Sequence, residues 1–203
     1  SLSGKIVLSQ ARMKSFVKYL GIIMSINRIG IIGAGQMGTG IAHVMALANY
    51  DVILNDVLPE HLITAKTTIT QNLDRQISAN KISVDEASKA MSLVKTSIDL
   101  EAVANTDLII EAVNEEEELK RKVFLSIMPY LGEHTVQASN TSSISITRLA
   151  SSTDRPEIFL GFHFMNPVPI MQLVELIPGI ATTQDTFEKC KAVVNRLGKT
   201  VAR

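Results

Sequence analysis

The sequence contains no tryptophan and only one cysteine, Cys190. A single cysteine excludes an internal disulfide framework and is typical of a protein kept in a reducing compartment. We interpret Cys190 as a buried, unreactive thiol within a predicted helix. The sequence also lacks an apolar run long enough to span a bilayer. We therefore expect a globular cytoplasmic protein with no membrane partner.

The net charge is zero, because 20 acidic residues balance 20 basic ones. Nothing in this balance indicates nucleic acid as a partner, and we predict no metal site. The chain has 203 residues, of which 46% are hydrophobic and 20% are charged. This is enough for one α/β domain with a proper core.

Residues 1–26 contain no acidic side chain but carry four basic ones among serines and apolar residues. Such a composition is typical of an organelle transit peptide, which would place the protein in the mitochondrial matrix. We favour an upstream extension of natural or artificial origin, because the segment from Met24 already resembles a natural N-terminus. Residues 27–203 are then assigned to one domain.

Residues 30–44, GIIGAGQMGTGIAHV, place Gly33, Gly35 and Gly38 in the spacing G-x-G-x-x-G. This spacing alone is weak, since a tight turn without a ligand gives the same pattern. A dinucleotide site also requires a strand before the glycines, a helix after them and an acid about 20 residues further on. All three are predicted here: a strand over 28–33, a helix over 36–49, and a strand over 51–56 that ends at Asp56.

Each glycine has a distinct task in a dinucleotide site. Gly33 permits the tight turn, Gly35 lets the backbone approach the pyrophosphate, and Gly38 lets the helix pack closely on the strand. The helix N-terminus, with Gln36 and Met37 in its first turn, attracts the phosphates through its N–H groups and its dipole.

Asp56 indicates which dinucleotide to expect. Its carboxylate would accept hydrogen bonds from the adenosine ribose hydroxyls. Its charge would repel a 2′-phosphate, which favours NAD over NADP.

The order of the predicted elements indicates an α/β fold. Residues 58–94 are predicted as an inserted helical hairpin, with Pro59 in its first turn and a capping box over 83–86. The remaining elements are a short strand near Val94, strands over 106–113, 134–139, 157–164 and 171–177, helices over 115–131 and 183–196, and a terminal strand over 200–203. We predict a Rossmann-type, doubly wound, mostly parallel sheet with extra C-terminal strands.

Two side chains indicate proton-transfer chemistry. His163 stands at the end of one predicted strand, and Glu175 lies in the next, within the apolar run MQLVELI. A carboxylate in such a run is costly to bury without a partner, and a histidine on a neighbouring strand is a suitable one. His163 would take a proton from a substrate hydroxyl, oriented by Glu175. The residues alone leave a structural histidine equally open.

Two neutral side chains lie near these residues in the predicted fold. Ser142, in the segment SNTSS after a strand, and Asn166, in a loop with two prolines, offer hydrogen bonds to substrate oxygens. For the serine-rich segment, the alternative interpretation is a helix cap.

These segments resemble the 3-hydroxyacyl-CoA dehydrogenases, including the bacterial 3-hydroxybutyryl-CoA dehydrogenases. The resemblance runs from about residue 28 to the end and rests on ordered motifs: GAGQMGTGIA, DLIIEAVNE, ASNTSSISIT, GFHFMNPVPIMQLVE and ATTQDTF. That family oxidises the 3-hydroxyl of an acyl-CoA thioester with NAD, in fatty acid β-oxidation or butyrate-type metabolism. The resemblance therefore implies an NAD-dependent dehydrogenase that acts on an acyl-CoA.

The resemblance also implies roles for single residues. His163 matches the catalytic histidine, Glu175 its partner acid, Ser142 the substrate-contacting serine and Asn166 the asparagine near the nicotinamide. Asp56 matches the ribose acid.

Glu115 and Lys120 match positions that line the family's cofactor site. From the pattern alone, Glu115 would belong to a solvated helix start and Lys120 would face solvent. Three further histidines match no family site and are expected to be structural or surface residues: His43, His61 and His134.

The sequence departs from the family at two places. Family members often carry lysines near the turn of the hairpin, where the CoA phosphates approach, but Ser78 and Ala79 stand here and only Lys81 remains. The family also continues into a helical domain that supplies part of the acyl pocket and the dimer interface. That domain lies outside this sequence. We therefore expect NAD binding, weak or no turnover by this chain alone, and a homodimer when the domain is present.

Two other functions stay open. One is a sister dehydrogenase acting on a sugar acid of the L-gulonate type, against which the segment HFMNPVP argues. The other is a non-catalytic NAD-binding module, against which His163 and Glu175 argue because a pure binder needs neither.

Overall fold

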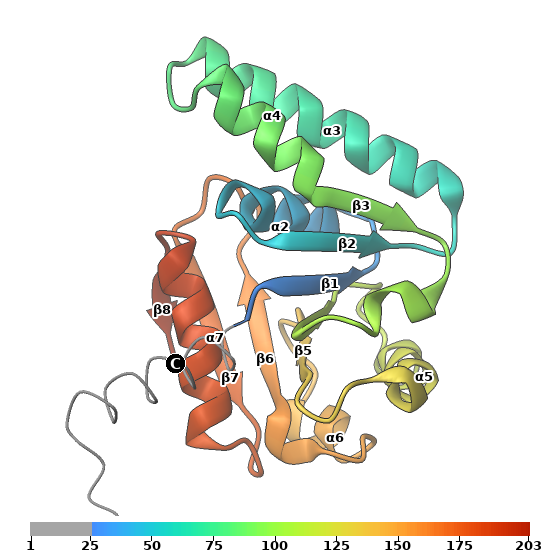
Figure 1. Cartoon of the computed structure of the whole chain (residues 1–203). Coiled ribbons are helices and arrows are strands. Elements are labelled where there is room, and N and C mark those ends of the chain that lie inside the picture. The colour runs from blue at the N-terminus through green and yellow to red at the C-terminus, as the bar shows by residue number, and fades with distance from the viewer. Residues whose placement is uncertain (1–25) are drawn as a thin grey trace, which may run out of the picture.

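The computed structural model describes residues 26–203, which form an eight-stranded sheet in the order β3-β2-β1-β4-β5-β6-β7-β8 (Figure 1). The predicted N-terminal extension falls outside the described residues, apart from Ile26. The strands are β1 (Arg28–Ile32), β2 (Asp51–Asn55), β3 (Val94–Ser97), β4 (Leu108–Glu111), β5 (Val136–Ser139), β6 (Phe159–Phe164), β7 (Leu173–Pro178) and β8 (Thr200–Ala202).

The sheet is mostly parallel. All pairs from β3 through β6 are parallel, β7 runs antiparallel to β6, and β8 is parallel to β7. The strand order reverses at β1, which is the point where open α/β sheets bind ligands. The predicted Rossmann-type sheet with extra C-terminal strands is confirmed.

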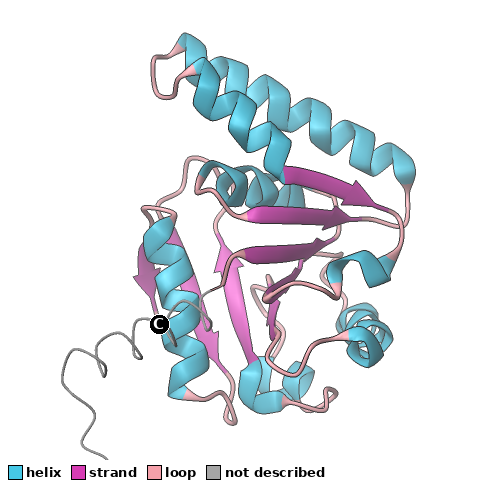
Figure 2. Cartoon of the chain, in the orientation of Figure 1, coloured by secondary structure: helices cyan, strands magenta, loops and turns pink. Residues whose placement is uncertain are grey.

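Helices cover both faces of the sheet (Figure 2). One face packs against α2 (Gln36–Leu47), α3 (Pro59–Ser78), α4 (Val84–Leu93) and α7 (Gln184–Arg196), and the other against α5 (Glu117–Ile127) and α6 (Ile146–Ala150). Because side chains alternate along a strand, Ile29 and Ile31 join the first core cluster and Ile32 joins a second one. None of the helices in the described part of the chain combines the length and the apolarity needed to cross a membrane.

The predicted helical hairpin is confirmed. Helices α3 and α4 lie side by side at the β3 edge of the sheet (Figure 1). The Ser83 side chain accepts a hydrogen bond from the Glu86 N–H at 3.1 Å, and the Glu86 carboxylate accepts one from the Ser83 N–H at 2.7 Å. This capping box starts α4. The buried positions of α3 recur at helical spacing: Leu62, Ala65, Ile69 and Leu73.

Some predicted boundaries were wrong. The helix predicted over 36–49 ends at Leu47, because Asn49 adopts a left-handed backbone with φ of 61°. The helix predicted over 115–131 begins at Glu117 and gives way to a 3₁₀ turn at Met128–Tyr130. Helix α6 was not predicted at all, although Ser145 caps it by accepting from the Arg148 N–H.

Candidate active site

The glycine turn between β1 and α2 has little room for side chains at two of its three glycines. Gly33 has φ of +103°, and a Cβ there would lie 2.7 Å from the Ala112 carbonyl oxygen. A Cβ on Gly38 would lie 1.8 Å from the Gly33 carbonyl oxygen. A Cβ on Gly35 would meet no atom within 4 Å. The space over Gly35 is therefore open to a ligand.

Helix α2 presents its N-terminus to that open space. Gly35 is the N-cap and provides no side-chain cap, and the first turn holds no acid. The N–H groups of this turn, including those of Gln36 and Met37, have no acceptor inside the helix. The Met37 side chain packs against the core, so only its backbone faces the turn. This arrangement fits the phosphates of a dinucleotide.

Asp56 follows β2 and is tied to the glycine turn. Its carboxylate accepts hydrogen bonds from the Ala34 N–H at 2.8 Å and the Leu58 N–H at 3.0 Å, and lies 3.2 Å from the His61 Nδ1. Burial acts to raise the pKa of Asp56, but these hydrogen bonds outweigh it and hold the pKa below its ordinary value. His61, which sequence reasoning treated as structural or surface, thus borders the site.

His163 and Glu175 lie directly opposite each other on the antiparallel strands β6 and β7. The His163 Nδ1 is 2.8 Å from a Glu175 carboxylate oxygen, with 17% and 40% of the two side chains exposed. The predicted neighbouring-strand pair is therefore present. With Nδ1 on the carboxylate, Nε2 is the nitrogen left to meet a substrate.

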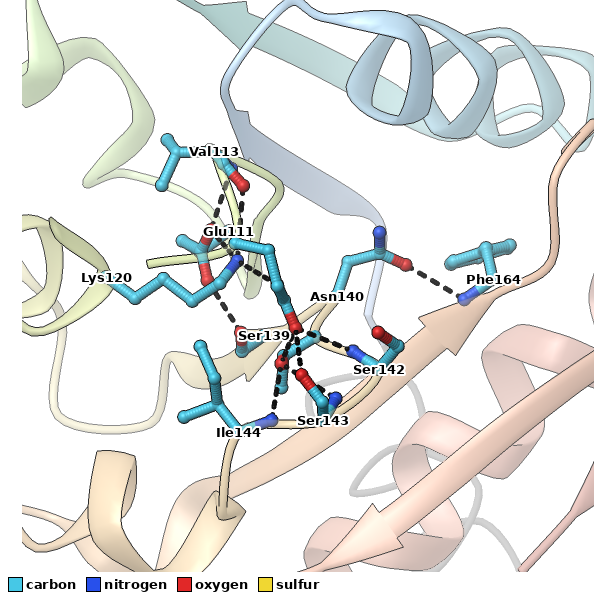
Figure 3. Close-up of polar contacts among 11 residues, drawn as sticks. Glu111, Val113, Lys120, Ser139, Asn140, Ser142, Ser143, Ile144 and Phe164 are labelled. Atoms are coloured by element: carbon cyan, nitrogen blue, oxygen red, sulfur yellow. Dashed lines mark hydrogen bonds and ion pairs between the residues drawn. The ribbon is translucent and has the colours of Figure 1, made fainter. Parts of the chain in front are cut away.

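Ser142 lies in a loop after β5 that wraps around one oxygen of Glu115. That oxygen accepts from the Ser142 N–H at 3.1 Å, from the Ser143 hydroxyl at 3.2 Å and from the Thr141 hydroxyl. In Figure 3 the labelled Ser142 and Ser143 lie beside the carboxylate oxygen that they contact. Burial acts to raise the pKa of Glu115, but the Thr141 hydroxyl and Lys120 outweigh it and lower the pKa.

Lys120 lies behind Glu115 and is fully buried, so the prediction of a solvent-facing lysine was wrong. Its Nζ lies 2.8 Å from a Glu111 oxygen, 3.2 Å from the Val113 carbonyl and 3.2 Å from Glu115 (Figure 3). Glu111 is the last residue of the buried strand β4, and its carboxylate needs a partner. Lys120 on helix α5 therefore points inward toward it. All three ammonium protons therefore have protein acceptors.

Sequence reasoning missed Glu111. Its second oxygen accepts from the Ser139 hydroxyl at 2.6 Å, and its first also accepts from the Val113 N–H at 2.7 Å. Burial raises the pKa of Glu111, against the opposing effect of Lys120. The signal was available: an acid in the apolar run DLIIEAV needs a partner for the same reason as Glu175.

Asn140 and Asn166 connect the parts of the site. The Asn140 side chain accepts from the Phe164 N–H at 2.9 Å, which fixes the Ser142 loop to the residue after His163 (Figure 3). The Asn166 side chain accepts from the Gln36 amide at 3.2 Å. The carboxyl ends of parallel strands lie on the same side of the sheet. The predicted site residues therefore gather where the strands β1, β2, β5 and β6 end.

Comparisons with known proteins identify relatives of the whole described domain. Residues 28–203 match the family model for the 3-hydroxyacyl-CoA dehydrogenase NAD-binding domain. A 3-hydroxybutyryl-CoA dehydrogenase from Bradyrhizobium diazoefficiens is 53% identical over 177 residues, which cover 87% of this chain and 60% of that protein. The mitochondrial hydroxyacyl-coenzyme A dehydrogenase of Rattus norvegicus is 40% identical, over 86% of this chain and 57% of that protein.

A solved structure shows the same fold. The (S)-3-hydroxybutyryl-CoA dehydrogenase from Ralstonia eutropha superposes with a TM-score of 0.85 at 40% identity, covering 87% of this chain and 62% of that one. The chain thus spans less than two thirds of the length of these relatives. From its match over residues 28–203, the chain belongs to the 3-hydroxyacyl-CoA dehydrogenase family and carries that family's NAD-binding domain.

Proposed function

We propose that this chain is the cofactor-binding and proton-transferring part of an NAD-dependent 3-hydroxyacyl-CoA dehydrogenase. The reaction oxidises the 3-hydroxyl of the acyl chain to a ketone and runs in both directions. The observation that carries the proposal is the His163–Glu175 pair, 2.8 Å apart on adjacent strands at the edge that also holds the glycine turn. A protein that only binds NAD needs no such pair.

His163 is the general base of the proposed reaction. Its Nε2 takes the proton of the substrate hydroxyl while the C–H bond of the same carbon breaks. Glu175 holds the ring through Nδ1 and stabilises the imidazolium that forms. NAD, when bound along the glycine turn and Asp56, supplies the acceptor for the hydride.

Ser142 and Asn166 are proposed to hydrogen-bond substrate oxygens and set the distance of the hydroxyl from His163. Glu115 holds the Ser142 N–H, so the serine enters the site on a fixed loop. Glu115 is proposed to contact the cofactor as well, with Lys120 behind it.

A groove beside α3 is proposed to take the CoA part of the substrate. One cavity, of about 420 Å³, borders Gly35 on one side, which is left to the dinucleotide, and Thr64, Thr68 and Asn72 of α3 on the other, which is proposed to belong to this groove. A second cavity, of about 670 Å³, shares Pro167 with the first and is lined by Arg75 and Lys81. Lys81, the lysine that the turn keeps, and Arg75 are proposed to meet the CoA phosphates.

We also propose that the natural protein that contains this chain is a cytoplasmic homodimer. The buried thiol of Cys190, with its pKa raised by burial, fits a reducing compartment. The dimer follows from the resemblance, which assigns the subunit contacts to the family's helical domain.

The test is an assay of NADH consumption with acetoacetyl-CoA, using the natural protein that contains this chain. Replacing His163 with Gln removes the base, so we expect kcat to fall by about 10³-fold. NADH binding, measured by fluorescence titration, is expected to stay unchanged. The matched control is His134→Gln on the exposed surface, which is expected to behave as the wild type. Oxidation of L-gulonate without any reaction of acyl-CoA would contradict the proposal.

A further inference from the structure

The loop between β6 and β7 forms one wall of both cavities beside α3. We call residues 166–172 the groove loop. Its Pro167 and Pro169 line the cavity next to the glycine turn and also the cavity that holds Arg75 and Lys81. The position of this loop therefore sets the width of the whole groove.

Lys199, just before β8, reaches this loop from a distant part of the chain. Its Nζ donates hydrogen bonds to the Val168 carbonyl at 2.9 Å and to the Met171 carbonyl at 2.6 Å. The adjacent Thr200 N–H donates to the Gln172 carbonyl at 2.8 Å. Three carbonyl groups of the groove loop are thus held by two consecutive residues.

The chemistry of Lys199 is unusual for a residue that only fills space. The residue is 9% exposed, and no carboxylate of residues 26–203 forms an ion pair with its ammonium group. Burial lowers the pKa of Lys199. A buried cation is costly, and here the loop carbonyls provide the compensating interactions. The free energy of burying this group is therefore coupled to the position of the loop.

Lys199 is also mounted on a fixed support. Arg196, the last residue of α7, donates to the Ala48 carbonyl at 2.9 Å and the Asn49 carbonyl at 2.6 Å, and lies over the Tyr50 ring. These contacts fasten the end of α7 to the turn between α2 and β2. Because Arg196 anchors this end of α7, Lys199 holds the loop relative to the C-terminal end of α2, one helix length away from the glycine turn.

The loop has few other restraints on its outer part. Ile170 is 71% exposed, and its N–H bonds only to Pro167 within the same loop. Val168 is buried against Gly40, where an added Cβ would lie 2.9 Å from the Val168 Cβ. The section from Pro169 to Gln172 therefore depends on Lys199 and Thr200 for its position.

We propose that Lys199 is a positioning residue for the substrate, which fixes the groove loop and so sets the affinity of the groove for the CoA thioester. The inference rests on the proposed function, because it requires the groove to hold CoA. Lys199 itself is proposed to touch neither substrate nor cofactor. Its loss should weaken substrate binding more than it slows proton transfer at His163.

The first experiment measures amide hydrogen exchange in this chain by NMR. Lys199→Met keeps the length of the side chain but removes the donors. We expect the Ile170 and Met171 amides to exchange about tenfold faster, since two charge-assisted hydrogen bonds to the loop are lost. The β7 amides are expected to keep their rates. Lys191→Met, on the exposed face of α7, is the control and should change neither set. Equal exchange at Ile170 in Lys199→Met and wild type would overturn the inference.

The second experiment separates positioning from stability. We expect Lys199→Met to raise KM for acetoacetyl-CoA several-fold and to change kcat much less. Titration with coenzyme A alone is expected to show the same loss of affinity. Faster exchange with unchanged KM and unchanged coenzyme A affinity would overturn the role in substrate binding. Lys199→Gln, which keeps a neutral amide NH₂ group as donor, replaces Lys199→Met if the latter does not fold, and an intermediate effect is expected.

Failure of the proposed function gives a different result. In that case the natural protein that contains this chain neither reacts with acetoacetyl-CoA nor binds coenzyme A, while the exchange experiment still shows whether Lys199 holds the loop. Faster exchange in Lys199→Met, with no coenzyme A binding by the wild type, would then overturn the inference about CoA and leave Lys199 as a structural clamp of the loop.

Discussion

The glycine turn and Asp56 come from one continuous segment, residues 33–56, whereas the surroundings of His163 come from several separated segments. In the first region the backbone provides the site, and the turn works because side chains are absent from Gly33 and Gly38. In the second region side chains provide it, through bonds such as that from Ser139 to Glu111, which lie 28 residues apart in sequence. Substitutions that add side-chain atoms should therefore damage the first region most. Substitutions that remove hydrogen-bond donors or acceptors should damage the second region most.

The largest expected effect tests whether the first region is limited by space. In Gly38→Ala the new Cβ meets the Gly33 carbonyl oxygen, a backbone atom that moves only if the turn shifts. We expect a loss of about 3 kcal/mol in the free energy of unfolding. Urea denaturation followed by circular dichroism measures it. A stability equal to wild type would break the comparison, because the turn would then tolerate side chains.

Gly35→Ala is the matched variant for the same turn. Its backbone, with φ of −69° and ψ of −169°, suits any residue, and the new methyl group meets no protein atom. We therefore expect wild-type stability but NADH affinity lower by about 10- to 100-fold, since the methyl group would lie where the pyrophosphate is proposed to approach. Fluorescence titration with NADH measures the affinity. Unchanged affinity would show that the dinucleotide lies elsewhere.

A smaller effect, on the preference for NADH over NADPH, is expected at Asp56. This residue provides the carboxylate that is proposed to bind the ribose in the first region. Asp56→Ala removes the charge that would repel a 2′-phosphate, so the preference for NADH over NADPH should fall by about tenfold. Titrations with both cofactors measure the ratio. Asp51→Ala, at the exposed start of β2, is the control and should keep the preference. The role given to Asp56 fails if both variants discriminate equally well.

The same contrast explains what the sequence could and could not predict. The glycine turn, Asp56 and the hairpin follow local rules of spacing and capping, so their residues were placed correctly. The His163–Glu175 pair was also predictable, because Glu175 lies in an apolar run next to a strand with a histidine, although 40% of its side chain is exposed. The same rule also applies to Glu111, which the sequence analysis missed. The pattern alone placed Lys120 in solvent, whereas the resemblance assigned it to the cofactor site.

Other parts of the site depend on strand order, which no local pattern contains. Lys199 reaches the groove loop only because β8 pairs with β7, which places Thr200 beside Leu173. Asn140 reaches Phe164 only because β5 and β6 are neighbours. These contacts join segments whose separation in sequence varies widely, so spacing alone could not reveal them.

Buried polar groups add a further contrast between the regions. In the second region Glu111 and Lys120 satisfy each other, whereas His43, on the buried face of α2, is 1% exposed and forms no hydrogen bond with any residue of the described chain. Burial lowers the pKa of His43, and the nearby Gln76 side chain offsets only part of this effect. The charged form of His43 is therefore disfavoured in the folded protein.

The smallest expected effect follows from the sign of this shift. The folded-state pKa of His43 lies below its unfolded value of 6.5, so the unfolded chain binds more protons once the pH falls below that value. The contribution of His43 to stability should therefore decline as the pH falls from 7.5 to 5.5, above the range where Asp56 and Glu115 titrate. His43→Gln removes the titrating group and should make the decline shallower in urea denaturation at each pH, whereas His134→Gln, on the exposed surface, should leave it unchanged. An equal decline in both variants would mean that the first region tolerates a buried imidazolium, and that its packing is looser than the glycine turn implies.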